Sequence, residues 1–345
     1  MAKKVSQQSA PSYKVNVAGS EFKQSAPKGL RSVVVENHVD MAAISTIIIG
    51  LGESDPGYSF EIGDPVEVAM MEDSVPLFKG ELISIEYTYN ISGPPSVVLR
   101  AIDHVHRLGR GRKTRFWEKK TDEDVALEVG AECELAVESD PTEEVRPYIL
   151  QRNESNIAFL KRLAARNNFQ VRVEGESLLF KAAEFGGAAE PISMGANIVS
   201  LNVNFNSVNQ VQKVIVQGWS IKDKCEVIGT CAYADIESIG PGDMGAQASE
   251  VFGESVAYIT DVPVSSQKIA DDIAKSEMAR LARQFCRGKC AILGNNGVIA
   301  GKMVEFSGFS KGLNGKYYVI SSRHSINPRS GYTTEFTFCS NTYGE

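Results

Sequence analysis

The chain of 345 residues has few of the features that mark disulfide-rich scaffolds, metalloproteins and membrane proteins. It contains 6 cysteines, 4 histidines and 2 tryptophans, and so few cysteines exclude a disulfide scaffold of this length. No apolar run approaches the ~20 residues of a membrane helix. The apolar run that comes nearest to this length, residues 41–52, predicts a buried strand. A net charge of −7 excludes a protein whose whole surface binds nucleic acid.

The amino terminus and the composition indicate the class of protein. The first residues are basic but have no apolar segment behind them, so they are not a secretory signal. We therefore expect a protein that is made in the cytoplasm, does not insert into membranes by itself and keeps its cysteines as free thiols. Hydrophobic residues make up 43% and charged residues 23%, as in globular proteins, and the length allows roughly two or three domains.

Short runs of β-branched residues, separated by glycine and proline, dominate both ends of the chain, whereas the middle carries helix signals. Thr121 and Asp124 have capping-box spacing, Ser155 precedes an apolar helical stripe, and Asn167 can end it. We predict an α+β, mainly β fold with two related antiparallel, tube-like β-barrel domains and an α+β domain between them. The expected divisions are a flexible 1–12, a first barrel at 13–103, an α+β domain at 104–190, and a second barrel at 191–345 with a long loop (239–257) and a helix (265–286).

A repeated pattern links the two β-rich halves. The sequence Gly-x-x-Val-Glu begins at Gly63 and again at Gly301, and a second glycine-led strand follows at Gly80 and at Gly315. Antiparallel sheets in general share such turns. The repeat nevertheless favours two related barrels.

Few residues are arranged for catalysis or for holding a cofactor. His104 and His106 share a face if they lie in a strand, but no pattern of acidic or thiol residues nearby completes a metal-ligand set. Three residues separate Cys286 from Cys290, which favours two half-buried thiols at a helix end over a redox or zinc motif. Nucleophile elbows and His-Glu-x-x-His motifs are missing. We therefore assign no catalytic, cofactor-binding or metal-binding residue.

The strongest local charge signal is a basic segment, 107–115, with fixed positive charges at Arg107, Arg110, Arg112, Lys113 and Arg115. Such a run can follow a phosphate backbone, but no aromatic residue interrupts it to stack on bases. It can also bind an acidic protein partner or the acidic stretch 121–145 of the same chain. We favour a protein–protein interface formed by these five residues.

Two segments together resemble a known family. The first runs from Asp103 through the basic segment to Thr121 and Ala126, and the second contains Gln151-x-Asn153-Glu154-Ser155-Asn156 followed by Phe159-Leu160-x-Arg162-Leu163. Both are similar to the phage late control protein D family and its VgrG relatives. That family usually has Asp where this chain has Asn156, and both residues support the start of a helix. The closing strands at 314–324 and 331–336 are similar as well.

This resemblance implies a structural baseplate hub of a contractile tail or injection system. Hubs of that family are homotrimers with two tube-like barrels per chain, and they join a sixfold inner tube to a threefold spike. The implied partners are a separate spike protein, an inner tube protein ring and baseplate or wedge proteins, with nucleic acid or cargo only passing through the channel and with no cofactor. The protein would be part of a phage-tail-like particle. Two alternatives stay open: a tail-associated cell-envelope hydrolase, and a nucleic-acid-binding module that uses the basic segment.

Overall fold

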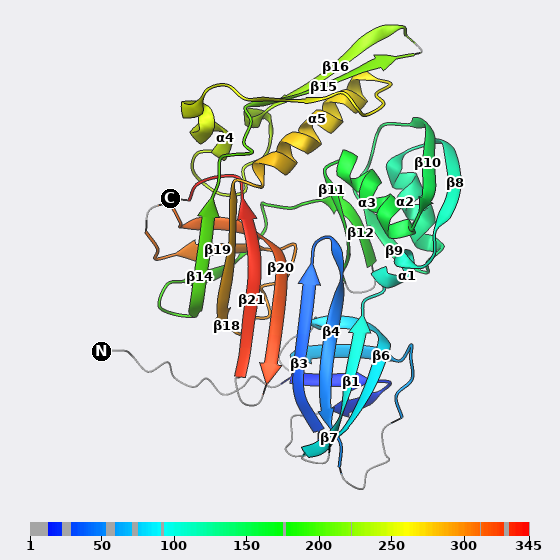
Figure 1. The fold of residues 1–345 in the computed structure, drawn as a ribbon, viewed down its shortest axis with the longest axis vertical. Coiled ribbons are helices and arrows are strands. Elements are labelled where there is room, and N and C mark those ends of the chain that lie inside the picture. Colours follow the sequence, from blue (N-terminus) through cyan, green and yellow to red (C-terminus); the bar gives the residue numbers. More distant parts are fainter. Residues whose placement is uncertain are drawn as a thin grey trace.

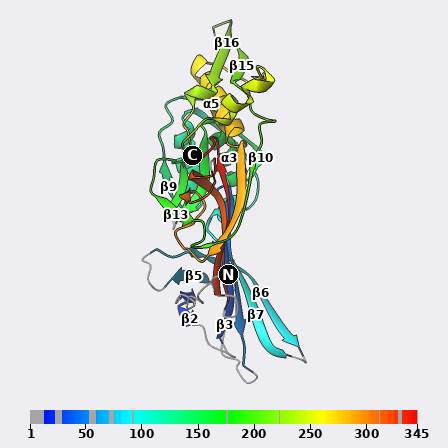
Figure 2. The ribbon, with the colours of Figure 1, turned by 90° about the vertical axis from the view of Figure 1, so that its left-hand side faces the viewer.

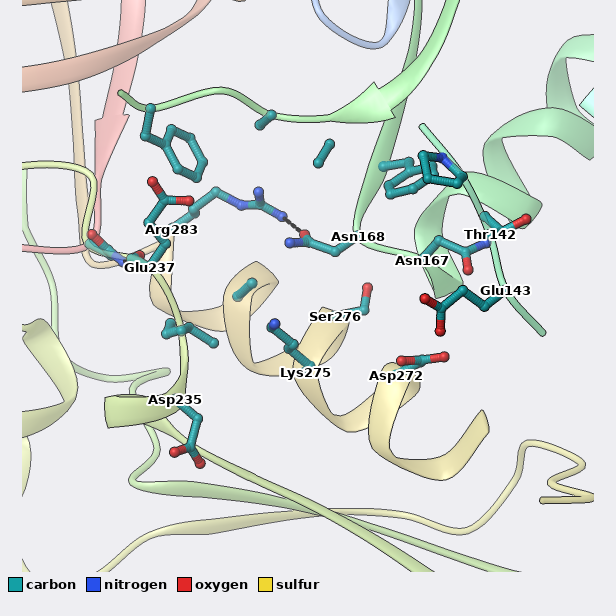
Figure 3. Close-up of a pocket in the computed structure, with 18 of the residues that line it drawn as sticks. Thr142, Glu143, Asn167, Asn168, Asp235, Glu237, Asp272, Lys275, Ser276 and Arg283 are labelled. Carbon is teal, nitrogen blue, oxygen red and sulfur yellow. Dashed lines mark hydrogen bonds between the residues drawn. The ribbon is translucent and has the colours of Figure 1, made fainter. Parts of the chain in front are cut away.

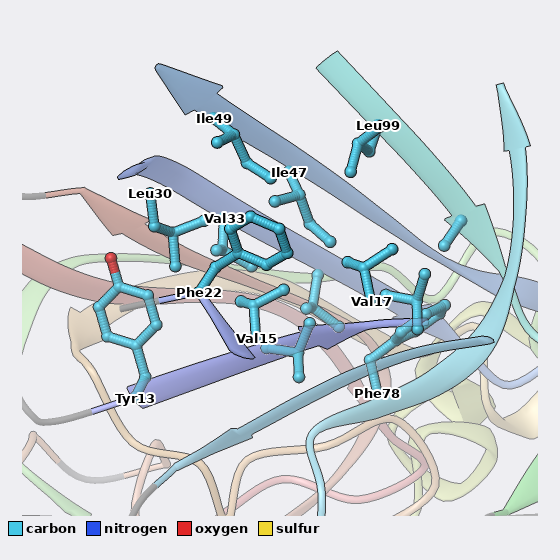
Figure 4. Close-up of a cluster of buried hydrophobic side chains, with 14 of the residues drawn as sticks. Tyr13, Val15, Val17, Phe22, Leu30, Val33, Ile47, Ile49, Phe78 and Leu99 are labelled. Atoms are coloured by element: carbon cyan, nitrogen blue, oxygen red, sulfur yellow. The ribbon is translucent and has the colours of Figure 1, made fainter. Parts of the chain in front are cut away.

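Strands with alternating apolar side chains make up most of the structure, a computed structural model. It describes residues 13–22, 29–52, 59–70, 75–90, 93–174, 177–221, 223–310, 312–327 and 331–344. In β1 (Tyr13–Val17) the side chains of Tyr13, Val15 and Val17 are buried, while Asn16 is exposed. Figure 4 shows these three side chains among those of Phe22, Ile47 and Leu99 in the core of the first half.

One sheet of 13 strands runs through the molecule, and its main path is β14-β18-β21-β20-β3-β4-β7-β6-β5-β1-β2. A branch leaves this path at β20, which pairs with β19, and β19 pairs with β13. In Figure 1, β14 lies at the left of the sheet and β6 at the lower right. The other strands of this sheet are β2 (Ser20–Phe22), β3 (Gly29–His38), β4 (Met41–Gly50), β5 (Pro65–Met70), β6 (Phe78–Asn90), β7 (Gly93–Ile102), β13 (Ala189–Ser193), β14 (Ile198–Phe205), β18 (Cys286–Leu293), β19 (Met303–Ser307), β20 (Gly315–Asn327) and β21 (Gly331–Ser340).

Two smaller units are inserted into this sheet. The α+β unit between β7 and β13 has its own core. It contains α1 (Val105–Gly109), β8 (Lys113–Lys120), α2 (Asp122–Ala131), β9 (Ala136–Ser139), β10 (Arg146–Glu154), α3 (Asn156–Arg166), β11 (Phe169–Glu174) and β12 (Ser177–Ala182). The second unit, between β14 and β18, lies at the top of Figure 1. It contains β15 (Lys213–Ser220), β16 (Cys225–Ala232), η1 (Tyr233–Asp235), α4 (Gly245–Ala248), η2 (Ser249–Phe252), β17 (Val256–Ile259) and α5 (Gln267–Ala282).

A glycine allows α5 to pack closely on its sheet. A Cβ atom at Gly229 would lie 2.2 Å from the backbone carbonyl carbon of Ala270, so only glycine fits beneath the helix. None of the described helices is long and apolar enough to cross a membrane.

The two halves of the large sheet have the same strand order. The first half runs β3-β4-β7-β6-β5-β1, and the second runs β14-β18-β21-β20-β19-β13. These strands also follow one another along the chain in the same order, so each of the six has a counterpart in the other half, whereas β2 has none. The halves differ at one strand, because β1 pairs antiparallel with β5 whereas β13 pairs parallel with β19.

The two irregularities of the second half coincide with two of the four in the first half. The β3–β4 ladder shifts register between Leu30 and Ser32, and the corresponding β14–β18 ladder shifts between Ile198 and Ser200. A second pair of shifts lies between Leu82 and Ser84 in the β6–β7 ladder and between Val319 and Ser321 in the β20–β21 ladder. Because bulges are specified features of a sheet, their coincidence identifies the halves as two versions of one design.

The repeated Gly-x-x-Val-Glu pattern lies in a turn that both halves share. Gly63 and Gly301 have φ angles of 98° and 87°, which favour glycine. The Gly63 N–H donates to the carbonyl of Leu82 at 2.9 Å, and the Gly301 N–H donates to the carbonyl of Val319 at 2.8 Å. The repeat therefore marks the turns that lead into β5 and β19.

The two halves are joined edge to edge within the chain. Residues 321–326 of β20 pair antiparallel with residues 33–38 of β3. Ile326 and Tyr332 of the second half are part of the hydrophobic core of the first half. The joint is therefore both a continuous backbone ladder and a shared core.

Most expectations about the fold are confirmed. The class is α+β and mainly β, with two related antiparallel halves. Thr121 forms the expected capping box with Asp124, and Ser155 caps α3. Residues 1–12, which were expected to be flexible, lie outside the described residues. The domain divisions at 103 and 190 stay a prediction.

Two expectations differ from the structure. The segment 239–257 contains α4, η2 and the start of β17, because small residues such as Ala246 pack into the core under α5. Cys286 and Cys290 are buried in β18 rather than half-buried at a helix end. The reason is that α5 ends at Ala282, and the alternation of the strand that follows points both thiols inward.

The six cysteines, none of them in a disulfide, differ in exposure, which predicts their reactivity. Cys225 is exposed, Cys133 is half-buried and the other four are buried. Burial raises the pKa of Cys286 and of Cys290 to about 12, and thiolates rather than thiols react. We expect a disulfide reagent at pH 8 to label one thiol rapidly in the folded protein and six after denaturation. Rapid labelling of three or more thiols in the folded protein would contradict this expectation.

Candidate functional site

Several strand edges of the large sheet have no partner among the described strands, and those of β14 and β6 are two of them. β14 ends the sheet and pairs only with β18. β6 pairs with β5 only as far as Glu81, so its residues 83–90 leave one edge open. Figure 2 shows β6 and β7 extending together away from the body of the molecule. The N–H and C=O groups of such edges are a template for another strand.

Apolar side chains accompany both open edges. Tyr87 and Tyr89 on β6 are 47% and 74% exposed, and Val199 on β14 is 64% exposed. At the joined edges of β20 and β3, by contrast, His324 and Val35 are completely buried. The edges of β20 and β3 are therefore paired and buried, whereas the corresponding edges of β6 and β14 are exposed. Tyr87 and Tyr89 were not among the residues predicted to form an interface. The signal in the sequence is that they stand two positions apart in an expected strand, so they lie on one face of it.

Six neighbouring strands, β14, β18, β21, β20, β3 and β4, share a surface with a shallow cavity of about 710 Å³. Arg323 of β20 pairs across the joint with Glu36 of β3 at 3.6 Å. The rest of the lining mixes polar and charged side chains, such as Lys289 and Glu335, with apolar ones, such as Met41 and Ile44. This surface carries no large field of one sign.

Three of the five basic candidates are bound to carboxylates of their own chain. Arg107 binds Glu81 and also Glu134, the latter at 3.3 Å. Lys113 contacts Glu132 at 2.9 Å, and Arg115 binds the same carboxylate. Burial acts to raise the pKa of Glu132, but its hydrogen bonds to Arg115 and Lys113 hold that pKa below its ordinary value.

The other two candidates face solvent. The Arg112 guanidinium donates to the carbonyl of Asn153 at 3.3 Å and is exposed. Arg110 is also exposed, and its side chain makes no hydrogen bond or ion pair to any described residue. The structure thus divides the basic segment, because the acidic stretch of the same chain takes Arg107, Lys113 and Arg115 and leaves Arg110 and Arg112 outward.

The two candidate histidines meet at one carboxylate. The Nε2 atoms of His104 and His106 lie 3.5 and 3.7 Å from the carboxylate of Glu81, which also binds Arg107. Burial acts to raise the pKa of Glu81, but Arg107 and the histidines together hold it below its ordinary value. Within the described part of the chain, no group of three or more His, Cys, Asp or Glu side chains is arranged to hold a metal ion. The cluster instead ties β6 to α1.

A second cavity, of about 630 Å³, lies between the α+β unit and α5 (Figure 3). Two of its charged side chains have partners across the cavity: Lys268 pairs with Glu143 at 3.0 Å, and Arg283 donates to the Asn168 side-chain carbonyl at 2.8 Å. Burial raises the pKa of Asp272, while the nearby Lys268 lowers it. The two contacts join the α+β unit to α5.

Comparison with solved structures defines the class to which this fold belongs. The 43 kDa tail protein of prophage MuSo2 from Shewanella oneidensis matches 95% of this chain and 98% of its own, with a TM-score of 0.73 and 12% identity. A tail protein from Neisseria meningitidis covers 96% of both chains, with a TM-score of 0.71 and 13% identity. An E. coli component of the type VI secretion system covers 96% of this chain and 78% of its own, with a TM-score of 0.66 and 10% identity. The fold is that of phage tail and type VI secretion proteins.

The family is narrower than this class. Residues 7–328 match the family described as the Alg8 N-terminal domain, and the chain belongs to that family. The search of curated proteins gave no match.

Proposed function

We propose that the protein is a structural hub in the baseplate of a contractile tail or injection system. In this role it is a homotrimeric adaptor between a sixfold inner tube and a threefold spike, and it belongs to a phage-tail-like particle. The observation that carries the proposal is the duplication inside one chain, with its common strand order and coincident bulges. The tail and type VI secretion proteins that share the fold support it.

The duplication solves a problem of symmetry. A ring of six tube subunits offers six equivalent contact surfaces, whereas three single barrels would meet only half of them. Three chains with two related halves each present six related units. A repeated head-to-tail contact closes into a ring when its rotation completes a full turn after a whole number of copies, and forms a filament otherwise. The surface that both halves share carries charges of both signs, and we propose that it lines the channel of such a ring.

Native mass spectrometry and end-on electron-microscopy averages of the purified protein test this function. We expect the mass of three chains and a ring of six lobes around a central channel. A monomer or dimer at micromolar concentration, or a ring with three dissimilar sectors, would count against the hub. The alternative of a cell-envelope hydrolase requires cleared zones in a peptidoglycan zymogram, and we expect none.

The outward part of the basic segment is proposed to contact other baseplate proteins. The double variant Arg110→Ala/Arg112→Ala removes two exposed charges and one bond to a backbone carbonyl, so the subunit should stay folded. We expect at least a tenfold drop in the number of assembled particles counted by electron microscopy. Arg152→Ala, an exposed arginine of the same unit outside the segment, is the matched control. Equal particle numbers in both variants would reject the interface.

A further inference from the structure

The joint inside the chain predicts the contact between chains. β20 uses the edge beyond its β19 partner to pair with β3. Its counterpart β6 has the same edge beyond β5, and no described strand pairs with that edge. The counterpart of β3 is β14, whose outer edge also has no partner in the described parts of the chain. We infer that β6 of one copy pairs antiparallel with β14 of the next copy, which repeats the β20–β3 joint and rests on the ring proposed above.

The shared bulges set the register of this pairing. Counted from them, Thr88 corresponds to Ser325 and Asn202 corresponds to Val34. Ser325 and Val34 are direct partners in the joint within the chain. Thr88 of one copy therefore lies opposite Asn202 of the next. The whole register is Ser84 opposite Asn206, Ile85 opposite Phe205, Glu86 opposite Asn204, Tyr87 opposite Val203, Thr88 opposite Asn202 and Tyr89 opposite Leu201.

The side chains at the two open edges fit this partner. Tyr87 and Tyr89 correspond to His324 and Ile326, which are 0% and 1% exposed within the joint. On β14, the half-buried Leu201, Val203 and Phe205 already border the core of the second half. Pairing covers the two tyrosines against this apolar row and satisfies the open backbone groups of both strands. Each open edge therefore matches the other in strand length and in its apolar side chains, and we expect a second copy of this chain to occupy it.

This pairing determines how the halves are joined around the ring. In each chain the second half joins the first through β20 and β3, and the first half joins the next chain through β6 and β14. The six contacts around three chains are then equivalent in kind, although three lie within chains and three between them. An open edge at β6 or β14 no longer exists once the ring has closed, which removes a site for aggregation.

Engineered disulfides test the register. In a Cys225→Ser background, the pair Thr88→Cys/Asn202→Cys places two thiols directly opposite each other between copies, at a distance that a disulfide spans. Within one chain the two positions lie at different ends of the large sheet, so a disulfide between them joins different chains. The control pair Ser84→Cys/Asn202→Cys is four residues out of register, roughly 14 Å too far apart. Both pairs replace small polar residues and leave the cores intact.

We expect mild oxidation to convert the in-register variant to covalent dimers and trimers on denaturing gels, at least tenfold more than the control. A second variant, Tyr87→Ser/Tyr89→Ser, should remain folded by circular dichroism and raise the trimer dissociation constant at least tenfold. A trimer by native mass that forms no in-register disulfide would overturn the pairing and leave the hub function standing. Equal cross-linking of both cysteine pairs would overturn the pairing as well. A monomer that does not cross-link would count against the pairing and the ring together.

Discussion

Replacing Asp122 by alanine is expected to lower the free energy of unfolding of the α+β unit by about 3–5 kcal/mol, because it leaves buried guanidinium groups without their carboxylate. The side chain of Asp122 is 2% exposed. It binds Arg166, whose Nε donates at 2.7 Å, and it lies 3.3 Å from Nε of Arg146. Asn167 donates to the same carboxylate at 2.7 Å. One carboxylate thus links the start of α2 to β10 and to the end of α3.

Fluorescence of Trp117 measures this loss locally. Trp117 stacks on Phe159 in the core of the α+β unit, with ring centroids 5.2 Å apart. Trp219, the other tryptophan, is 59% exposed and is replaced by phenylalanine in every variant. Urea unfolding of Asp122→Ala is then compared with that of Glu118→Ala, an exposed carboxylate in the same unit, which should change stability by at most about 0.5 kcal/mol. A loss below about 1 kcal/mol for Asp122→Ala would show that the network is not required.

Features that depend on neighbours in the chain were predictable from the sequence. The capping box at Thr121 and Asp124 and the N-cap at Ser155 each involve residues three positions apart, so their pattern is visible without a fold. The repeated glycine turns at Gly63 and Gly301 were visible for the same reason. Each of these local signals marks an element that the structure contains.

Features that depend on distant partners were not predictable. The acidic stretch was one of several partners that the sequence allowed for the basic segment, and only the fold brings Glu132 beside Lys113 and Arg115. The partners of Asp122 lie at 146, 166 and 167, beyond any local pattern. Strand alternation likewise indicated that β6 and β14 exist, but an open edge is defined by the strands that pair elsewhere. The candidate interface therefore emerged from topology rather than from residue types.

The joint between the two halves is expected to weaken in acid, and His324 is the cause. His324 lies in β20 opposite Val35, and burial lowers its pKa to about 4 from 6.5. Its Nδ1 lies 3.0 Å from the Tyr332 hydroxyl. Since the unfolded chain binds a proton at higher pH than the folded one, the stability present above pH 6.5 is lost as the pH falls to 4, by roughly 3 kcal/mol.

A second buried group opposes this loss. Burial raises the pKa of Asp103 to about 6 from 3.8, which adds stability over nearly the same range as the pH falls and masks the loss in the wild type. The variant His324→Asn keeps an acceptor near the position of Nδ1 but does not titrate. The free energy of unfolding is measured against pH for this variant and for the wild type. Because Asp103 is present in both, the difference between the two curves removes its contribution. We expect the difference to change by roughly 3 kcal/mol between pH 7 and pH 4, whereas Thr334→Val, which removes a neighbouring hydroxyl without a titrating group, should run parallel to the wild type. A His324→Asn curve that also runs parallel to the wild type would mean that the imidazole takes up its proton without opening the joint.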